Sequence, residues 1–405
     1  MAEPLRILQL VPQFPFPMID GGKIGIASIL REFSRQGAEV TLFYLSQNEP
    51  SEEALKEARQ YCEPIMCKYS TKNTARRIIA SVLYDRPIYV AKHENDFVFD
   101  TLKKNIENRH FDIIHADHSS MAPLGFFAKQ LLKKPVGLRL HNVEWLIWKR
   151  YSDSIASWNP KKLYLRRQAH LLRKEEVNFY SSMDICFAIT DKDRDKAISM
   201  APNAKIVIAS AGVDTEDWKP KDYIRRNPYE LVLAAYYKWV HNVDAVRWFV
   251  DEVLPIVKER FPETTVFLIG KDGPSWFKHI RSKGVFYIGF VPKVQPYLNR
   301  AAAYVAPLFV GSGIRIKILE AMAMELPVVS TPIGAEGINC TENEGLFIAR
   351  DAQGFANQII KILANREFSL KAGKSAREFI VNNYSWNRNV GIMLEEYEKL
   401  ANKQQ

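Results

Sequence analysis

Short apolar runs typical of buried strands recur along the chain, and segments with helical spacing of apolar residues lie between them. The first series of runs covers residues 5–11, 38–45, 112–116, 135–140, 184–189 and 205–209. A second series covers residues 229–235, 264–270, 285–289, 303–308 and 346–348. Alternating strands and helices predict a largely parallel sheet with helices on its faces, and ligands at the carboxyl ends of the strands. Because 405 residues exceed what one hydrophobic core supports, we expect two α/β domains of about 200 residues each.

Residues 311–331 combine a glycine-rich loop, a short helix and a buried strand. Gly313 allows close approach of the backbone to a ligand, and a helix beginning near Ile314 would present free N–H groups to an anion. Arg315 and Lys317 add positive charge, and the two oxygens of Glu320 can hold a pair of neighbouring hydroxyls. This pattern predicts a nucleotide site. In the alternative interpretation, Lys317 and Glu320 form an ordinary surface ion pair, and the loop is only a helix cap.

The motif Gly-Ser-Gly-x-Arg-x-Lys-x-Leu-Glu-Ala-Met-Ala, followed by Pro-Val-Val-x-Thr, resembles the donor motif of the retaining nucleotide-sugar glycosyltransferases of family four. It is similar to the variant found in bacterial cell-surface polysaccharide enzymes. The resemblance implies the GT-B fold, with two Rossmann-like doubly wound domains facing across a cleft. It assigns Glu320 to the ribose and puts Ser312 where relatives carry a second glutamate. Glu325 stands where a glycine is usual, so a positive φ there would cost about 1 kcal/mol.

The resemblance also implies the domain boundaries. The segment from Ala211-Gly212-Val213-Asp214 to Pro220 is similar to the family's entry into its second domain. We therefore expect an acceptor-side domain over residues 1–213 and a donor domain over 214–385. A final helix, residues 386–405, opens at Ser385-Trp386-Asn387 and returns to the first domain in the resembled fold.

Polar clusters follow two expected strands of the first domain: His115-Ala116-Asp117-His118-Ser119 and His141-Asn142-Val143-Glu144. Carboxyl ends of neighbouring parallel strands share one sheet edge, so Asp117, His118 and His141 are the candidate catalytic residues. The first cluster resembles the family's histidine-containing loop near the reacting centre. The alternative is that each histidine has only a structural role.

Two further candidates for donor binding come from the resemblance. The pair Gly21-Gly22 is similar to a loop that approaches the donor phosphate, which makes Gly22 a candidate, although a plain tight turn remains the alternative. In the second domain, Tyr236 and His241 stand where many relatives carry an arginine and a lysine. Lys238, together with Arg315 and Lys317, must then neutralise the diphosphate.

The net charge of +10 predicts an anionic partner. No helix-turn-helix, zinc-finger or RNP signature is present, so nucleic acid is not expected. No metal or other cofactor is expected, since Asp191-Lys192-Asp193 has the pattern of a solvated helix start. No apolar run reaches about 18 residues, which predicts a cytoplasmic protein. Aromatic and basic residues over 145–174 suggest peripheral contact with an anionic membrane at its inner face; a solvated helix is the alternative.

Taken together, these patterns predict a retaining glycosyltransferase. It would move a sugar from a nucleoside diphosphate sugar to a hydroxyl of a glycan or lipid-linked acceptor, such as a cell-envelope or polysaccharide precursor. Two other classes stay open. A nucleotide-sugar epimerase of GT-B fold would use the histidine clusters as acid and base, and a non-catalytic nucleotide-sugar-binding subunit is suggested by Ser312, Tyr236 and His241.

Overall fold

The computed structural model of the protein describes residues 3–18, 21–221, 226–310 and 313–403. It divides into two compact units. Unit 1 comprises residues 1–210 and 389–405, and unit 2 comprises residues 211–388. The second crossing of the chain into unit 1 occurs within the last helix, α16 (Trp386–Asn402).

Unit 1 contains a seven-stranded parallel sheet in the order β3-β2-β1-β4-β5-β6-β7. Its strands are β1 (Arg6–Val11), β2 (Glu39–Ser46), β3 (Glu63–Lys68), β4 (Ile113–Asp117), β5 (Val136–Leu140), β6 (Ile185–Ala188) and β7 (Ile206–Ile208). β4 and β5 are buried along their whole length, as expected for central strands with helices on both faces. The strand order reverses between β1 and β4, which creates a switch point at the carboxyl edge.

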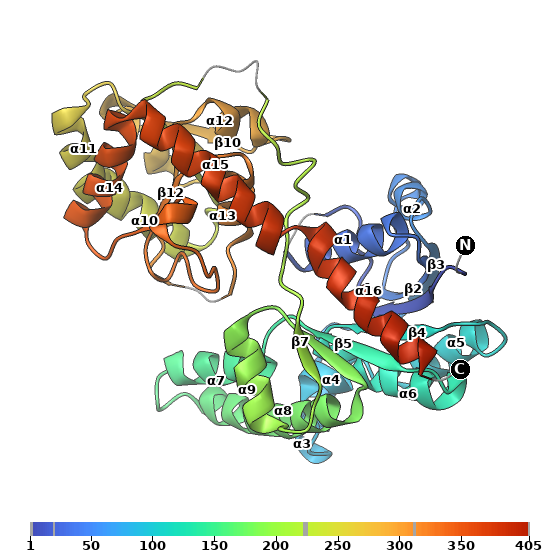
Figure 1. Ribbon diagram of the computed structural model, residues 1–405. Helices are drawn as coiled ribbons and strands as arrows, with labels where there is room; N and C mark the ends of the chain where they lie inside the picture. The colour runs from blue at the N-terminus through green and yellow to red at the C-terminus, as the bar shows by residue number, and fades with distance from the viewer. Residues whose placement is uncertain (1–2, 19–20, 222–225, 311–312, 404–405) are drawn as a thin grey trace. The chain divides into compact units, whose positions relative to one another are not determined.

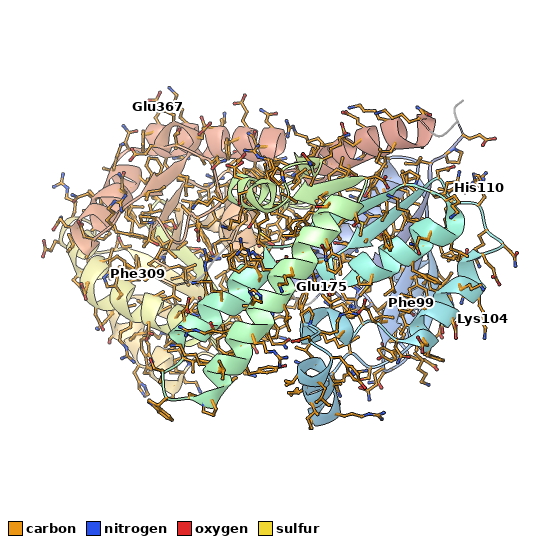
Figure 2. The ribbon with its side chains drawn as sticks, turned by 90° about the horizontal axis from the view of Figure 1, so that it is seen from below. Phe99, Lys104, His110, Glu175, Phe309 and Glu367 are labelled. Atoms are coloured by element: carbon orange, nitrogen blue, oxygen red, sulfur yellow. The ribbon has the colours of Figure 1, made fainter. Side chains whose placement is uncertain are left out.

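The helices of unit 1 cover both faces of this sheet (Figure 1). They are α1 (Gly21–Arg35), α2 (Glu52–Ala58), α3 (Ala75–Leu83), α4 (Ile88–Ala91), α5 (Asp96–Ile106), α6 (Ala122–Leu132), α7 (Glu144–Ser154), α8 (Pro160–Ser182) and α9 (Asp191–Met200). Within one layer, Phe99 of α5 packs against Phe127 of α6 with 5.1 Å between ring centroids; Figure 2 marks Phe99.

One expectation for unit 1 was wrong. The pair Gly21-Gly22 does not form a loop, because α1 begins at Gly21 and both glycines lie in its first turn. The segment after Trp145 contains two helices, the second of them long. α7 ends at Ser154, and α8 restarts at Pro160 with Asn159 as its cap, where Asn159 Oδ1 accepts a hydrogen bond from Lys161 N at 2.9 Å. Proline favours the first turn of a helix and disfavours continuation from the preceding residues.

The last helix is part of the unit 1 core. Tyr397 of α16 is fully buried, and its ring meets Phe187 edge-on at 5.3 Å between centroids. The ring fills the space above Gly137 of β5, where a Cβ atom would lie 2.5 Å from Tyr397 Cε1. A side chain at position 137 would therefore displace the helix. The chain thus returns to unit 1, whose second segment comprises residues 389–405.

Unit 2 contains a six-stranded parallel sheet in the order β10-β9-β8-β11-β12-β13. Its strands are β8 (Glu230–Ala234), β9 (Thr265–Ile269), β10 (Val285–Gly289), β11 (Ala303–Ala306), β12 (Val328–Ser330) and β13 (Leu346–Ile348). Its α-helices are α10 (Val240–Trp248), α11 (Leu254–Arg260), α12 (Gln295–Arg300), α13 (Ile316–Ala323), α14 (Ala352–Ala364) and α15 (Arg366–Asn383). The order reverses between β8 and β11, so both units have the doubly wound topology that the alternating pattern predicts.

The turn after α13 has the backbone conformation expected from the resemblance. Glu325 has φ 57°, in the left-handed region where a glycine is usual. Its carbonyl oxygen accepts a hydrogen bond from Arg226 NH1 at 2.7 Å, and Arg226 NH2 donates to Met324 O at 3.0 Å. These bonds satisfy carbonyl groups that the end of the helix leaves open, and they offset the cost of the strained residue.

Candidate active site

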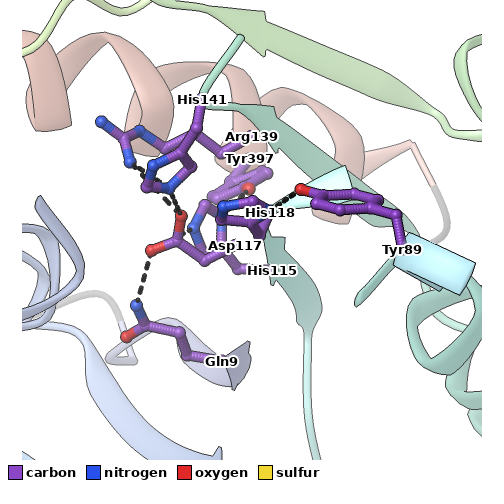
Figure 3. A network of polar contacts seen from close by, with 8 residues as sticks. All are labelled: Gln9, Tyr89, His115, Asp117, His118, Arg139, His141 and Tyr397. Atoms are coloured by element: carbon purple, nitrogen blue, oxygen red, sulfur yellow. Dashed lines mark hydrogen bonds and ion pairs between the residues drawn. The ribbon is translucent and has the colours of Figure 1, made fainter. Parts of the chain in front are cut away.

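Three neighbouring strands of unit 1 bring polar side chains together at the switch point. Gln9 of β1 lies opposite His115 of β4, and Asp117 lies opposite Arg139 of β5. Because side chains alternate along a strand, His115 and Asp117 point to the same face of the sheet. Figure 3 shows that these residues, together with His118, His141, Tyr89 and Tyr397, form one polar network.

Asp117 is the centre of this network and is fully buried. One carboxylate oxygen accepts from Arg139 NH1 at 3.3 Å and lies 2.8 Å from His141 Nε2; the other accepts from Gln9 Nε2 at 3.5 Å. Burial raises the pKa of this carboxyl, but the charge of Arg139 and the contact with His141 hold the pKa well below its usual value. Asp117 is therefore a charged anchor that orients its neighbours.

His141 has two competing partners. Its Nε2 lies 2.8 Å from Asp117 Oδ1 and also 2.8 Å from Arg139 NH1. One nitrogen cannot both donate to the carboxylate and accept from the guanidinium. A bond donated to a buried carboxylate is the stronger, charge-assisted choice, so we assign the proton to Nε2. Burial and the charge of Arg139 lower the pKa of His141, and the ring is neutral at pH 7.

His118 follows directly after β4 and has a strained backbone with φ 110°. Its N–H donates to Arg139 O at 3.2 Å, and its ring stacks on His141 with 4.5 Å between centroids. Burial, followed by the proximity of His141, lowers the pKa of His118 well below its usual value. The structure thus brings Asp117, His118 and His141 together, with the two half-buried imidazoles neutral and stacked.

The network continues beyond His118 through one hydrogen bond, since His118 Nδ1 lies 2.5 Å from the hydroxyl of Tyr89 on α4. Burial raises the pKa of Tyr89 well above its usual value, and the nearby Glu144 carboxyl adds to that shift. Burial raises the pKa of Glu144 to about 7. The Tyr89 hydroxyl can donate to His118 Nδ1, which leaves the imidazole proton on Nε2.

The sequence reasoning missed Tyr89, because nothing local connects a residue in the short α4 helix with a loop 29 positions later. It also missed Glu176. This buried residue of α8 accepts hydrogen bonds from the N–H groups of Glu144 and Trp145 at 2.9 and 3.0 Å, which caps the start of α7. Burial raises the pKa of Glu176 to about 7.

A cavity of about 410 Å³ lies at the carboxyl edge of β1, β2 and β3. Aromatic, hydroxyl and amide side chains line it, with lysines at its rim; among them are Phe14, Gln47, Asn48, Tyr69, Lys23 and Lys72. Lys23 lies in the first turn of α1, beside Gly22. This cavity belongs entirely to unit 1, and its mixture of aromatic faces and hydrogen-bonding groups suits a polyhydroxylated ligand.

In unit 2, the predicted donor residues gather around α13. The helix begins at Ile316, two residues later than expected, because Arg315 has an extended backbone and serves as its cap. Arg315 NH1 donates to Gly313 O at 3.0 Å, which holds the end of the glycine loop against the helix. Gly313 has φ 79°, a conformation that favours glycine. Gly311 and Ser312 lie outside the described residues.

Lys317 and Glu320 are one turn apart on α13. Lys317 Nζ donates to Glu320 Oε2 at 2.8 Å and lies 5.7 Å from the centre of the Trp218 ring. Glu320 is buried, which raises the pKa of its carboxyl, while Lys317 opposes that shift. The Lys317–Glu320 ion pair that the alternative interpretation predicts is thus present. Its carboxylate is buried, however, whereas both charged groups of an ordinary surface ion pair are exposed to solvent.

The loop after β8 contains the other donor candidate. Lys238 is exposed, between buried Tyr237 and exposed Trp239. Trp239 stacks on His241 with 6.1 Å between ring centroids, and Phe290, after β10, has Lys271 Nζ 4.2 Å from its ring centre. Parallel strands place these loops at one edge, so aromatic and cationic groups share it. Gly22 belongs to unit 1 and Lys238 belongs to unit 2.

Among the described residues, no three His, Cys, Asp or Glu side chains are arranged to hold a metal ion. Asp191 and Asp193 lie at the start of α9, as the sequence predicts. Thr190 Oγ1 there accepts from Asp193 N at 3.1 Å and donates to Asp193 Oδ2 at 2.6 Å. No helix within the described ranges is long and apolar enough to cross a membrane.

Solved structures that match nearly the whole chain define the fold class. Sucrose-phosphate synthase from Thermosynechococcus elongatus matches with a TM-score of 0.68 and 14% identity, covering 98% of this chain and 99% of that one. TarM matches with a TM-score of 0.66 and 11% identity over 97% and 98% of the two chains. HepE from Anabaena, solved with UDP, matches with a TM-score of 0.62 and 14% identity over 98% and 100%. The protein has the GT-B glycosyltransferase fold.

Family models then identify the chain more closely. The model described as Glycosyltransferase Family 4 matches residues 19–217, and the model described as Glycosyl transferases group 1 matches residues 230–365. The protein belongs to the family-four type of glycosyltransferases, and it is an enzyme of that class. A protein of the cps region of Klebsiella pneumoniae is 23% identical over 407 residues, 94% of this chain and 96% of the relative. Trehalose synthase from Thermococcus litoralis is 24% identical over 190 residues, 43% and 44% of the two chains.

Proposed function

We propose that the protein is a retaining glycosyltransferase that moves a sugar from a nucleoside diphosphate sugar to a hydroxyl of a polysaccharide precursor. The observation that carries this proposal is the group at the start of α13, where Arg315, Lys317 and Glu320 lie beside the glycine loop. Solved relatives in complex with UDP, HepE and TarM, support a nucleotide-sugar donor. The relative from a cps region supports a polysaccharide product.

Catalysis follows from the charge at this helix. As the glycosidic bond breaks, negative charge develops on the diphosphate, and fixed cations stabilise that charge. Arg315 and Lys317 supply the cations, and the free N–H groups at the start of α13 add their dipoles. Lys238 on the neighbouring loop adds a third cation. In this account no metal is required, since the protein itself neutralises the leaving group.

The unit 1 network orients the reacting groups. Asp117 is buried and fully engaged, so it positions His141 and does not serve as a nucleophile on the sugar. His118 and His141 are half-buried and neutral, which lets them donate hydrogen bonds to hydroxyls without carrying charge. Retention of configuration then proceeds by attack of the acceptor hydroxyl on the face that the leaving group vacates.

The acceptor is a glycan held in the 410 Å³ cavity of unit 1. Its aromatic residues offer flat surfaces for sugar rings, and its serine, asparagine and glutamine side chains offer hydrogen bonds. A lipid-linked form of this acceptor, reached by peripheral contact with an anionic membrane at the inner face, is part of the proposal.

Nucleotide titration of two variants tests the donor site. We expect Lys317→Ala to weaken binding of UDP, and Glu320→Gln to cost about 2 to 4 kcal/mol because two charge-assisted hydrogen bonds to ribose are weakened. Lys361→Ala and Glu367→Gln, on α14 and α15, are matched controls of the same unit. Isothermal calorimetry measures the affinities. Wild-type affinity in both α13 variants would show that the donor site is elsewhere.

The epimerase alternative keeps one specific observation in its favour, the stacked imidazole pair of His118 and His141 beside Asp117. An epimerase would alter the sugar of its nucleotide substrate without an acceptor. Incubation with donor alone, followed by chromatography of the nucleotide sugars, separates the two functions. We expect the donor sugar to be unchanged or hydrolysed.

A further inference from the structure

Helix α3 exposes the apolar side of its sequence. In Ala75–Leu83 only Ser81 is buried, while Ile79 is 58% exposed and Leu83 is 73% exposed. Tyr84, directly after the helix, is also exposed. A helix of nine residues is marginal in water, and the two most exposed apolar residues of this one, Ile79 and Leu83, gain little from burial within their own unit. Its apolar face is therefore available to a partner.

Contacts with α8 place this face beside a second exposed group. Arg167 NH2 donates to Val82 O at 3.0 Å, and the Ser81 hydroxyl lies 3.3 Å from the Tyr164 hydroxyl. Leu163 lies one turn before Arg167 on the same side of α8 and is 76% exposed. We define the α3 surface as the exposed apolar residues of α3 and the residue after it, together with the exposed Leu163 of α8: Ile78, Ile79, Val82, Leu83, Tyr84 and Leu163. Figure 1 shows α3 next to α8 at one edge of unit 1.

Cations surround the α3 surface and acids are few. Residues 70–84 contain Lys72, Arg76 and Arg77 and no acid. The start of α8 adds Lys161, Lys162, Arg166 and Arg167, and the turn before it carries Trp158, which is 86% exposed. The acids nearest in sequence are paired: Asp85 accepts from Arg167, and Asp153 from Lys149.

We propose that the α3 surface docks unit 1 onto an anionic lipid bilayer. Apolar residues of a short helix would enter the boundary between headgroups and acyl chains, and the surrounding lysines and arginines would contact lipid phosphates. A second copy of this chain is a poor occupant, because joining two such surfaces would oppose two sets of cations. The inference deepens the proposed function, since it gives a lipid-linked acceptor a route to the enzyme.

Not every aromatic residue of the 145–174 segment is available for contact with a membrane. Trp145 does not face solvent freely: its Nε1 donates to Met200 Sδ at 3.1 Å, and Arg173 lies 5.3 Å from its ring centre. In the proposal, the exposed Trp158 and Leu163 of this segment contribute to the docking surface.

Flotation of the full-length protein with lipid vesicles tests the proposal. We expect binding to phosphatidylglycerol-containing vesicles at low salt, weaker binding at high salt, and little binding to pure phosphatidylcholine. Ile79→Ser combined with Leu83→Ser should weaken binding at least about tenfold, because two apolar anchors are lost. Phe97→Ser, another exposed apolar residue of unit 1, is the control and should bind like wild type.

Two double variants test how much positive charge contributes to vesicle binding. Lys72→Gln with Arg76→Gln should weaken vesicle binding and reduce its dependence on salt, whereas Lys103→Gln with Lys104→Gln, on α5, should not. Trp158→Ser gives a second test of the apolar contact if the α3 variant fails to fold. Circular dichroism confirms folding of each variant.

Three results would overturn the proposal: no binding of folded wild type to anionic vesicles, unchanged binding of the folded α3 or Trp158 variants, or a dimer in solution that the α3 variant dissociates. UDP affinity is measured on the same samples. If the wild-type protein binds UDP but not vesicles, the proposed docking surface is wrong and the proposed donor site stands. If it binds vesicles but not UDP, the proposed donor site is wrong and the docking surface stands.

Discussion

At the residue scale, Glu144 is the clearest case of a side chain whose protonation depends on its surroundings in the fold. The sequence places it at the end of a polar cluster, but only the fold shows that it is buried. Burial raises the pKa of its carboxyl to about 7. A pair of buried carboxyls, Glu144 and Glu176, therefore lies behind the candidate catalytic residues, and both change protonation near neutral pH.

This burial predicts a pH-dependent stability. Burial raises the pKa of Glu144 to about 7, so the folded state binds more protons than the unfolded state between the ordinary carboxyl pKa and 7. Its contribution is fully present at lower pH and is lost as the pH rises through 7. Glu144→Gln keeps the size and polarity of this side chain but cannot ionise. We expect this variant to gain stability relative to wild type as the pH rises, by an order of 2 to 3 kcal/mol at pH 8.

Urea unfolding of both proteins from pH 5 to pH 8 measures this difference. Glu107→Gln, an exposed residue at the end of α5, is the control and should show no trend with pH. A constant difference between wild type and Glu144→Gln over this range would mean that the Glu144 carboxyl titrates as it does in the unfolded chain.

At the element scale, α16 depends on the smallest residue of β5. Gly137→Ala should push Tyr397 away from the sheet and destabilise unit 1 by about 1 to 3 kcal/mol, the usual cost of overpacking. Gly391→Ala, on α16 itself, meets only Gln36 Oε1 at 3.5 Å and should be neutral or slightly stabilising. Thermal unfolding compares the two variants. Equal stability of Gly137→Ala and wild type would show that α16 does not rely on this contact.

Elements with strong local signals could be predicted from sequence, and others could not. Runs such as Ile185–Ala188 and Ala303–Ala306 are continuous and apolar, which marks buried parallel strands. β3 was missed because Glu63–Lys68 alternates and contains a proline, as edge strands do. The separation of α7 from α8 was missed although Pro160 signals it. The exposure of the apolar side of α3 was not predicted, because the spacing of apolar residues does not show whether that side of a helix is buried or exposed.

At the scale of the whole molecule, two doubly wound sheets follow from length and alternation, whereas the chemistry is spread over residues far apart in sequence. The Gly313–Glu320 group could be predicted because it is contiguous. The unit 1 network joins Gln9, Tyr89, Asp117, His141 and Tyr397 through tertiary packing, so sequence identified only the members at strand ends. Each unit contributes one edge of polar residues at its own switch point.

The central claim, retaining transfer from a nucleotide sugar, is tested most directly by the anomeric configuration of the product. The purified full-length protein is incubated with UDP-sugars and extracted envelope glycans, and nuclear magnetic resonance compares the new glycosidic linkage with that of the donor. We predict release of UDP and a product linkage with the donor's configuration. A product of inverted configuration, or an altered nucleotide sugar with no transfer, would contradict this account.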